Sequence, residues 1–226
     1  MLSALKNLFF PTLCAACQDT LGGGENIICT NCRHQLPETQ FHRYNDKAVQ
    51  KVFYGRLPIT QGTALFYFEK KGPVQQLLHR LKYKGQKNIS EFLGDWLGEE
   101  LAQDHLYTTI DVVIPVPLHP KKKRSRGYNQ VTGFAKALSS HLECSFRDDV
   151  LLKSKNTKTQ VFKGRMTRSD EVFEAFYIRP DTNLSGKHIL LVDDILTTGA
   201  TLEACGLELL KIPNVELSIA TMAIAT

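Results

Sequence analysis

One string of residues carries most of the information about the fold: His188-Ile-Leu-Leu-Val-Asp-Asp-Ile-Leu-Thr-Thr-Gly-Ala-Thr-Leu202. Its apolar run from Ile189 to Val192 is typical of a strand that is buried on both faces of a parallel sheet. Asp193 and Asp194 then place two carboxylates at the carboxyl end of the strand, the edge where open α/β sheets bind ligands. The string therefore predicts an α/β protein with a ligand site at this edge.

A short loop rich in hydroxyl groups follows the two carboxylates and precedes a helix predicted from about residue 201 to 211. The loop consists of Thr197, Thr198, Gly199, Ala200 and Thr201. Backbone N–H groups at a helix N-terminus, together with threonine hydroxyls, favour a phosphate. A ribose 5-phosphate would offer hydroxyls to the carboxylates and its phosphate to the loop. The alternative is a buried strand that ends in an ordinary capped turn.

The composition is that of a globular protein, with 226 residues, 42% apolar and 23% charged residues and a formal net charge of +5. We find no apolar run of the roughly 18 residues that a membrane span needs. The N-terminus up to Pro11 lacks the basic start and long apolar core of a signal peptide, and its leucines fit one face of a short helix. We therefore expect a cytoplasmic protein without membrane insertion.

The N-terminal region contains two C-x2-C pairs separated by eleven residues: Cys14, Cys17, Cys29 and Cys32. Four thiolates on two tight turns can surround one structural Zn²⁺ tetrahedrally. A pair of disulfides is the alternative, which a reducing compartment disfavours. Cys144 and Cys205 lie in helical or helix-edge contexts and are expected to be packed thiols.

The middle of the chain predicts a strand followed by two helices. The aromatic segment 62–69 is typical of a strand. Val74 to Leu81 follow helical spacing after Gly72-Pro73, and the helix is expected to end near Gly85 with Lys82 and Lys84 solvated. Ser90 is predicted to cap the second helix.

A second apolar strand, at 110–117, leads into a loop with five cations and then into an amphipathic helix from Val131 to Leu142. The cations of this loop are Lys121, Lys122, Lys123, Arg124 and Arg126. They could neutralise a pyrophosphate, contact a nucleic-acid backbone, or form a solvated charged loop. Further strands are predicted at 150–152 and 215–225, and a cationic segment at 153–168.

The string from 189 to 201 resembles the phosphoribosyl pyrophosphate (PRPP) signature of type I phosphoribosyltransferases. With the cysteine pairs and several ordered landmarks, nearly the whole chain resembles the ComF family of competence and GntX-like proteins. The landmarks are Leu81-Lys-Tyr-Lys-Gly85, Pro115-Val-Pro-Leu-His119, Arg126-Gly-Tyr-Asn-Gln130, Thr159-Gln160, Gly164-Arg165 and Ala175-Phe176. One departure is Tyr128, where the family usually has Phe.

The resemblance implies a type I phosphoribosyltransferase-like parallel sheet flanked by helices, with a small N-terminal zinc-knuckle module. We expect the knuckle at 1–40, a hood-like connecting region at 41–105 and the core domain at 106–226. Asp193 and Asp194 would be the catalytic and ribose-binding residues, with Mg²⁺ bound beside PRPP. The loop from Thr197 to Thr201 would hold the 5-phosphate.

Two functions follow from the resemblance, and both concern DNA uptake in natural transformation. In the first, the chain is a glycosyltransferase that transfers phosphoribose to an unidentified acceptor, and segment 153–168 closes over the substrate. In the second, it is a non-catalytic factor that holds single-stranded DNA through the basic loop and Tyr128, with PRPP as a regulatory or vestigial ligand. Other competence proteins, such as a ComF-type helicase, would be partners. An amidophosphoribosyltransferase is excluded, because it needs a processed N-terminal cysteine and the first cysteine here is Cys14.

Overall fold

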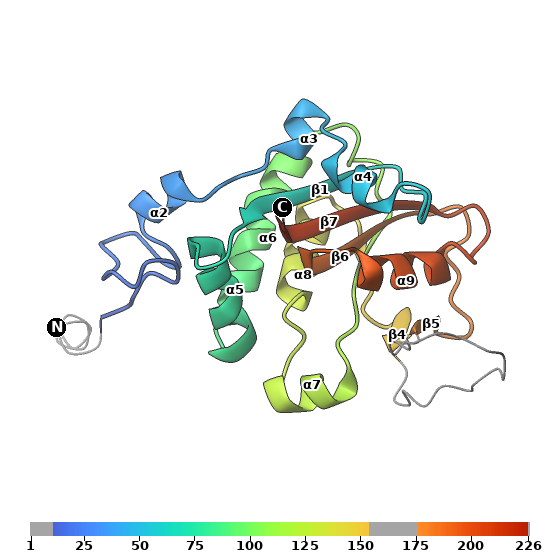
Figure 1. Cartoon of the computed structure of the whole chain (residues 1–226). Helices are drawn as coiled ribbons and strands as arrows, with labels where there is room; N and C mark the ends of the chain where they lie inside the picture. The colour runs from blue at the N-terminus through green and yellow to red at the C-terminus, as the bar shows by residue number, and fades with distance from the viewer. Residues whose placement is uncertain (1–10, 154–175, 226) are drawn as a thin grey trace, which may run out of the picture.

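The computed structural model describes residues 11–153 and 176–225. Its main element is a five-stranded parallel sheet in the order β1-β7-β6-β2-β3 (Figure 1). The strands of this sheet are β1 (Gly62–Phe68), β2 (Val112–Pro115), β3 (Ser145–Phe146), β6 (His188–Leu196) and β7 (Glu216–Ala225). A separate antiparallel pair is formed by β4 (Leu151–Lys153) and β5 (Phe176–Ile178).

Helices cover both faces of the sheet, which explains why the runs 112–114 of β2 and 189–192 of β6 are apolar on both faces. One face packs against α5 (Pro73–Tyr83), α6 (Asn88–Leu101) and α8 (Thr132–His141). The other packs against α3 (Phe41–Tyr44), α4 (Ala48–Phe53) and α9 (Ala200–Leu209), together with the β4–β5 pair. Figure 1 shows the two helical layers on either side of the strands. This arrangement confirms the predicted α/β class with a parallel sheet flanked by helices.

The strand order creates a crevice beyond the carboxyl ends of β2 and β6, which are hydrogen-bonded neighbours. After β2 the chain passes through α7 (Pro120–Arg126) and α8 to the edge strand β3. After β6 it passes through α9, on the opposite face, to β7. The chain thus runs from β2 toward one edge of the sheet and from β6 toward the other. The carboxyl ends of these two strands therefore form a topological switch point, where α/β sheets bind ligands.

Most elements expected from the sequence are present with small shifts at their ends. The strands predicted at 62–69, 110–117 and 215–225 correspond to β1, β2 and β7. The helix after Gly72-Pro73 is α5, whose Pro73 stands in the first turn, and Gly85 has φ +71° just beyond its end. The helix predicted from Val131 to Leu142 is α8.

Two local predictions are wrong. The basic segment is a short helix, α7, and not a loop: Pro120 occupies the first turn, and the His119 ring accepts a hydrogen bond from the Lys121 N–H at 3.1 Å. Ser90 lies inside α6, which begins at Asn88. Its hydroxyl donates to the Gln130 carbonyl and accepts from the Phe134 N–H, so it joins α6 to α8.

The cysteine region, with α2 (Thr30–Gln35), packs against the helical layer. The guanidinium of Arg33, in α2, lies 3.7 Å from the centroid of the Trp96 ring in α6. Buried Cys14, Ala16 and Ile28 belong to the same apolar cluster as α5 and α6. The knuckle is therefore joined to the domain by an apolar contact and a cation–π contact.

Three expectations remain outside what the structure describes. The N-terminal helix, the cationic segment after Lys153 and the landmarks at 159–165 lie in residues that are not described. The three-part division at residues 40 and 105 stays a prediction, although β1, from the connecting region, is an edge strand of the same sheet. Within residues 11–153 and 176–225, none of the helices is both long and apolar enough to cross a bilayer.

Candidate functional site

The two carboxylates of β6 lie on opposite faces of the sheet, because successive side chains of a strand alternate. Asp194 follows Leu190 and Val192 toward the α5–α8 layer. Asp193 follows Ile189 and Leu191 toward the α9 layer. The strand holds them rigidly up to the crevice, where the Asp194 N–H also donates to Oδ1 of Asp193 at 2.8 Å.

Both oxygens of Asp194 are engaged by side chains from other elements. Lys82, in the last turn of α5, places its Nζ 2.8 Å from Oδ1. Gln130 donates from Nε2 to Oδ2 at 2.6 Å, and its own Oε1 accepts from Arg126. Asp194 is buried, so these partners provide the charge compensation that a carboxylate without water requires.

Asp193 has a different electrostatic environment. Burial raises the pKa of Asp193 to about 8, and the neighbouring charge of Asp194 adds to the rise. The ammonium of Lys82 opposes it. Burial and the Asp194 charge thus favour the protonated form of this carboxyl, and a cation or a hydroxyl-rich ligand beside it would favour the ionised form.

A cavity of about 230 Å³ opens where the two carboxylates emerge from the sheet. Both carboxylates line it, with Thr201 at the start of α9 and the segment Val116–Leu118 after β2. The remaining polar lining includes Lys82, Lys122, Arg126, Asn129, Gln130 and Lys153. The cavity thus combines acidic, hydroxyl and cationic groups contributed by α5, β6, α7 and α9.

The loop between β6 and α9 has a tightly constrained backbone. Gly199, the N-terminal flanking residue of α9, has φ +80°, and a Cβ there would lie 2.7 Å from the Phe53 ring. Arg56 donates to the Thr198 carbonyl at 3.1 Å and pairs with Glu203. These contacts from the α4 region fix the path of the loop, so its N–H groups are held at the start of a ten-residue helix.

The structure brings together only some of the predicted site residues. Of the loop, Thr201 lines the cavity, whereas Thr197, Thr198 and Ala200 are exposed and Gly199 is buried. Of the basic segment, Lys122 and Arg126 line it, and Lys123 lines a neighbouring cavity. Lys121 and Arg124 are exposed and line neither. Tyr128 is half-buried and donates its hydroxyl to the Leu81 carbonyl.

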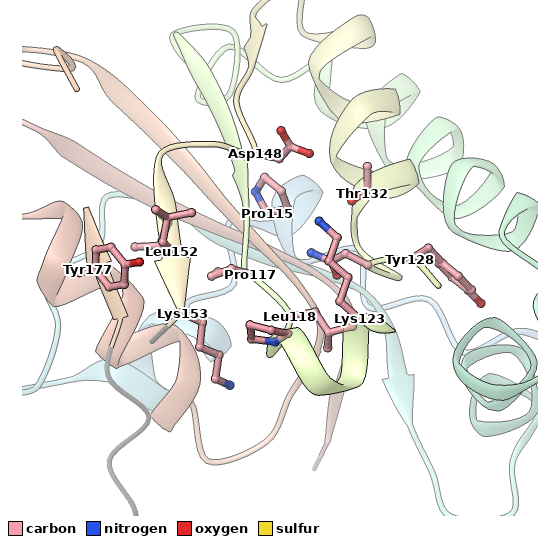
Figure 2. Close-up of a pocket in the computed structure, with 13 residues that line it drawn as sticks. Pro115, Pro117, Leu118, Lys123, Tyr128, Thr132, Asp148, Leu152, Lys153 and Tyr177 are labelled. Atoms are coloured by element: carbon pink, nitrogen blue, oxygen red, sulfur yellow. The ribbon is translucent and has the colours of Figure 1, made fainter. Parts of the chain in front are cut away.

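The neighbouring cavity is larger, about 780 Å³, and shares Pro117 and Leu118 with the smaller one (Figure 2). Figure 2 shows Leu152 and Tyr177, from the β4–β5 pair, on one side of it and Lys123 and Tyr128 on the other. Lys153 lines both cavities. The carboxylates of β6 line only the smaller cavity, so we place the candidate site there.

Two important residues of the site were not predicted in these roles. Lys82 was expected at a solvated helix end; that expectation is wrong, since its ammonium pairs with Asp194 and its side chain is only 22% exposed. Lys84, two residues on, is exposed as expected. Gln130 stood among the family landmarks, but nothing in its local pattern indicated a carboxylate 64 residues away. Both residues contact Asp194 only through the tertiary fold.

The four N-terminal cysteines form a compact cluster, with all sulfurs within 4.8 Å of one another. Cys17 Sγ and Cys29 Sγ are 3.7 Å apart, close to the ~3.8 Å edge of a tetrahedron with ~2.3 Å Zn–S bonds. The Cys29 N–H donates to Cys14 Sγ at 3.3 Å, and the Cys32 N–H to Cys29 Sγ at 3.4 Å. None of these sulfurs is bridged, so the cluster is compatible with a structural zinc and does not show the alternative disulfides.

The electrostatics of the four thiols also favour a bound cation. Burial raises the pKa of Cys32, and the three neighbouring sulfurs raise it further. Four thiolates in this volume would repel one another without a central positive charge. Outside the cluster, Cys205 is buried, and burial raises the pKa of Cys144 to about 11. These two thiols are packed, as predicted.

Comparisons with known proteins agree with the geometry. Residues 132–226 match the model of the phosphoribosyl transferase domain. The DNA utilization protein YhgH of Escherichia coli K12 is 27% identical over 86% of this chain and 88% of its own. Competence protein F of Haemophilus influenzae is 25% identical over 93% of this chain and 96% of its own. Competence protein ComFC of Streptococcus pneumoniae is 30% identical over 57% of this chain and 53% of its own.

Among solved structures, an adenine phosphoribosyltransferase is 16% identical, with a TM-score of 0.39 over 66% of this chain and 74% of its own. The matched domain, the parallel sheet and the acid pair at its switch point define the chain as a protein with a type I phosphoribosyltransferase fold. The similarity to the competence and DNA utilization proteins and the N-terminal cysteine cluster support the expected resemblance to the ComF family.

Proposed function

We propose that this chain binds PRPP with Mg²⁺ in the 230 Å³ cavity and serves DNA uptake as a phosphoribosyltransferase-type protein. The observation that carries the proposal is the content of that cavity: two adjacent carboxylates, the start of α9 and cations from α7. A ribose with a phosphate at C5 and a pyrophosphate at C1 needs these three kinds of group. The binding of PRPP is supported further by the match to the phosphoribosyl transferase domain.

The roles follow from the chemistry of each group. Asp193 and Asp194 would accept hydrogen bonds from the ribose hydroxyls, and the loop from Thr197 to Thr201 would hold the 5-phosphate through its N–H groups. Lys122 and Arg126 would neutralise the pyrophosphate. Bound Mg²⁺ would supply charge neutralisation on the pyrophosphate oxygens, and the carboxylate oxygens of the acid pair are the hard ligands it prefers.

In a transfer reaction the bond from ribose C1 to the pyrophosphate oxygen breaks, and its electron pair leaves with pyrophosphate. The acceptor donates the electron pair of the new bond to C1. Positive charge develops on the ribose ring between these events, and the carboxylates beside the ring would stabilise it. Catalysis would depend on placement and charge more than on a covalent nucleophile.

A second function is a non-catalytic factor that binds single-stranded DNA, with PRPP as a regulatory ligand. One observation favours it: Lys121, Lys122, Lys123 and Arg124 are all exposed on one short helix, where a phosphate backbone can reach them. The names of the relatives as competence and DNA utilization proteins fit either function. Other competence proteins, such as a helicase, are the partners we would expect.

The cysteine cluster completes the proposal. We assign it one structural Zn²⁺, because a closed set of four sulfurs leaves no open position for a substrate. The ion would fold a segment that is too short to form its own core. Unbridged thiols suit the reducing conditions of the cytoplasm, which is where we place the protein.

The experiment that tests the proposal measures pyrophosphate release from PRPP and Mg²⁺ in the presence of a panel of nucleobases and single strands. Acceptor-dependent release that is lost in Asp193→Ala/Asp194→Ala would establish a transferase. PRPP binding without release under any condition would favour the non-catalytic factor. A chain that neither binds PRPP nor releases pyrophosphate would overturn the proposal.

A further inference from the structure

The larger of the two cavities has no role in the proposed function, although it has the properties of a ligand site. Its volume of about 780 Å³ falls within the ~300–1,000 Å³ that is typical of small-molecule sites. Its lining comes from β2, α7, α8, β4 and β5, so five elements close around one space. Apolar side chains form most of this lining, and a few charged and polar groups complete it, which is the usual composition of such sites.

One wall of the cavity is apolar and preformed. Pro115 and Leu151 are buried, and Pro117 and Leu152 are half-buried. The proline rings fix the backbone at the end of β2. Figure 2 shows the Tyr177 ring beside Leu152 on this wall. Flat side chains held in place in this way suit a planar ring of a ligand.

Polar groups lie at the two ends of this wall. Asp148 precedes β4 and Lys153 ends it, so the strand separates the carboxylate from the ammonium. Figure 2 shows this arrangement, with Asp148 and Thr132 at one end of the cavity, Lys153 at the other and Pro117 between them. Within residues 11–153 and 176–225, the exposed Asp148 carboxylate has no hydrogen-bond or ion-pair partner. Both of its oxygens are therefore available to a ligand.

This order of groups matches a nucleoside monophosphate. The planar base would lie on the apolar wall, and the phosphate would bind Lys153 and Lys123, the cation across the cavity from Leu152 (Figure 2). An ionised carboxylate such as that of Asp148 only accepts hydrogen bonds, and its two oxygens suit two adjacent N–H donors. Guanine has such a pair on its pairing edge, whereas adenine, cytosine and uracil have a single donor group there. Guanine is therefore the base that fits Asp148 best.

The larger cavity does not suit the acceptor of the proposed transfer. In a displacement at ribose C1 the acceptor approaches from the face opposite the leaving pyrophosphate. Lys122, which would hold the pyrophosphate, directly precedes Lys123 of the larger cavity in α7. A ligand of the larger cavity therefore lies on the side of the leaving group, where it can act as an effector but not as the acceptor.

The two cavities are physically connected, since Pro117, Leu118, Asn129 and Lys153 line both. Burial raises the pKa of Asp193, and the positive charge of Lys153 opposes that rise. The ammonium of Lys153 thus acts on the acid pair as well as on the larger cavity. A phosphate that binds Lys153 from the larger cavity reduces the positive charge that is available to PRPP.

We propose that the larger cavity is a regulatory site for a nucleoside monophosphate, with a preference for guanine at Asp148, and that the bound nucleotide weakens PRPP binding through Lys153. The weakening rests on the proposed PRPP site, whereas nucleotide binding does not. Because coupling between two sites is reciprocal, PRPP must weaken nucleotide binding by the same factor.

The first test is calorimetric titration of the full-length protein with guanosine 5′-monophosphate (GMP) and adenosine 5′-monophosphate (AMP), without PRPP. GMP should bind at least about fivefold more tightly, because hydrogen bonds to a charged group are strong. Asp148→Asn should remove this preference, and the control Asp181→Asn should keep it, since Asp181 is exposed and lines neither cavity. Absence of binding, equal affinities for the two nucleotides, or a preference that survives Asp148→Asn would overturn the proposal.

A second test locates the nucleotide, because its phosphate could also enter the PRPP cavity. Asp193→Ala/Asp194→Ala, if folded by circular dichroism, should bind GMP as tightly as the unmodified protein does. Loss of GMP binding in this variant would place the nucleotide in the PRPP cavity and refute a separate site.

A third test measures the coupling by titration with PRPP and Mg²⁺ at rising GMP concentrations. The apparent dissociation constant of PRPP should increase severalfold and then level off, as expected for two coupled sites. An increase without limit would show that both ligands use one site, and an unchanged constant would overturn the coupling. If PRPP does not bind even without GMP, the proposed function fails, while the first two tests still decide the nucleotide site.

Discussion

Lys82 Nζ lies 2.8 Å from Oδ1 of Asp194, across 112 residues of sequence. The contact joins the last turn of α5 to the carboxyl end of the central strand β6. It provides the carboxylate with a cation before any ligand arrives and sets the orientation of its free lone pairs. The site is therefore preorganised by a residue from outside the signature string.

Lys82→Met should destabilise the protein and shift its ligand binding. The Asp194 carboxylate would lose its cation in a buried setting, which costs about 3–5 kcal/mol of unfolding free energy. The pKa of Asp193 would also rise, because the Lys82 charge normally lowers it. Urea unfolding and the pH midpoint of PRPP binding measure the two effects. Lys84→Met, at an exposed position of the same segment, is the control; equal effects of the two variants would contradict the role of Lys82.

PRPP–Mg²⁺ affinity should increase with pH and level off above about 8. Burial, reinforced by Asp194, raises the pKa of Asp193 to about 8. Below that pH the carboxyl must release a proton before it can face Mg²⁺ as a carboxylate, so affinity falls up to tenfold per pH unit. Calorimetry from pH 6.5 to 9.5 avoids the second phosphate ionisation near 6. The slope should disappear in Asp193→Asn. A slope that persists in this variant would show that a group other than Asp193 titrates.

Gly199→Ala should cost more stability than the same change at Gly186. Both glycines have positive φ, +80° and +70°, which costs an alanine about 1–2 kcal/mol. Only at Gly199 would the new methyl group meet the Phe53 ring, 2.7 Å away, whereas Gly186 faces open space. The overpacking adds about 1–3 kcal/mol. Thermal unfolding measures the difference, and equal losses would show that the loop does not depend on this contact.

The purified chain should contain one zinc ion. Cys17→Ser is the informative variant, because Cys17 is the exposed member of the cluster and its replacement leaves the apolar packing intact. It should lose zinc and expose residues 11–36 to proteolysis. Cys144→Ser, outside the cluster, should retain the metal. Elemental analysis that finds no zinc after purification without chelators would contradict the assignment.

The sequence predicted the fold where local patterns determine it. The apolar run before Asp193 is buried on both faces as expected, and the helical spacing from Val74 to Leu81 corresponds to α5. These features were predictable because periodicity reflects burial directly. The four-cysteine spacing likewise predicted a cluster within metal-binding distance.

The predictions that were wrong concern residues whose structure depends on contacts between segments far apart in the sequence. The five cations and flanking prolines favoured a loop, but Pro120 and the His119 cap start a helical turn there. Ser90 had the residue type of a cap, yet its hydroxyl joins two helices. Lys82 and Gln130 reach Asp194 only after α5 and α8 pack on the same face of the sheet, and no local pattern encodes such a pairing.

Asp193 and Asp194 together form the proposed PRPP site. Isothermal titration of the full-length protein with PRPP in the presence of Mg²⁺ tests it most directly. We expect saturable binding to the unmodified chain and no detectable binding to Asp193→Ala/Asp194→Ala, with the variant still folded by circular dichroism. Equal PRPP affinity of the two folded proteins would contradict it.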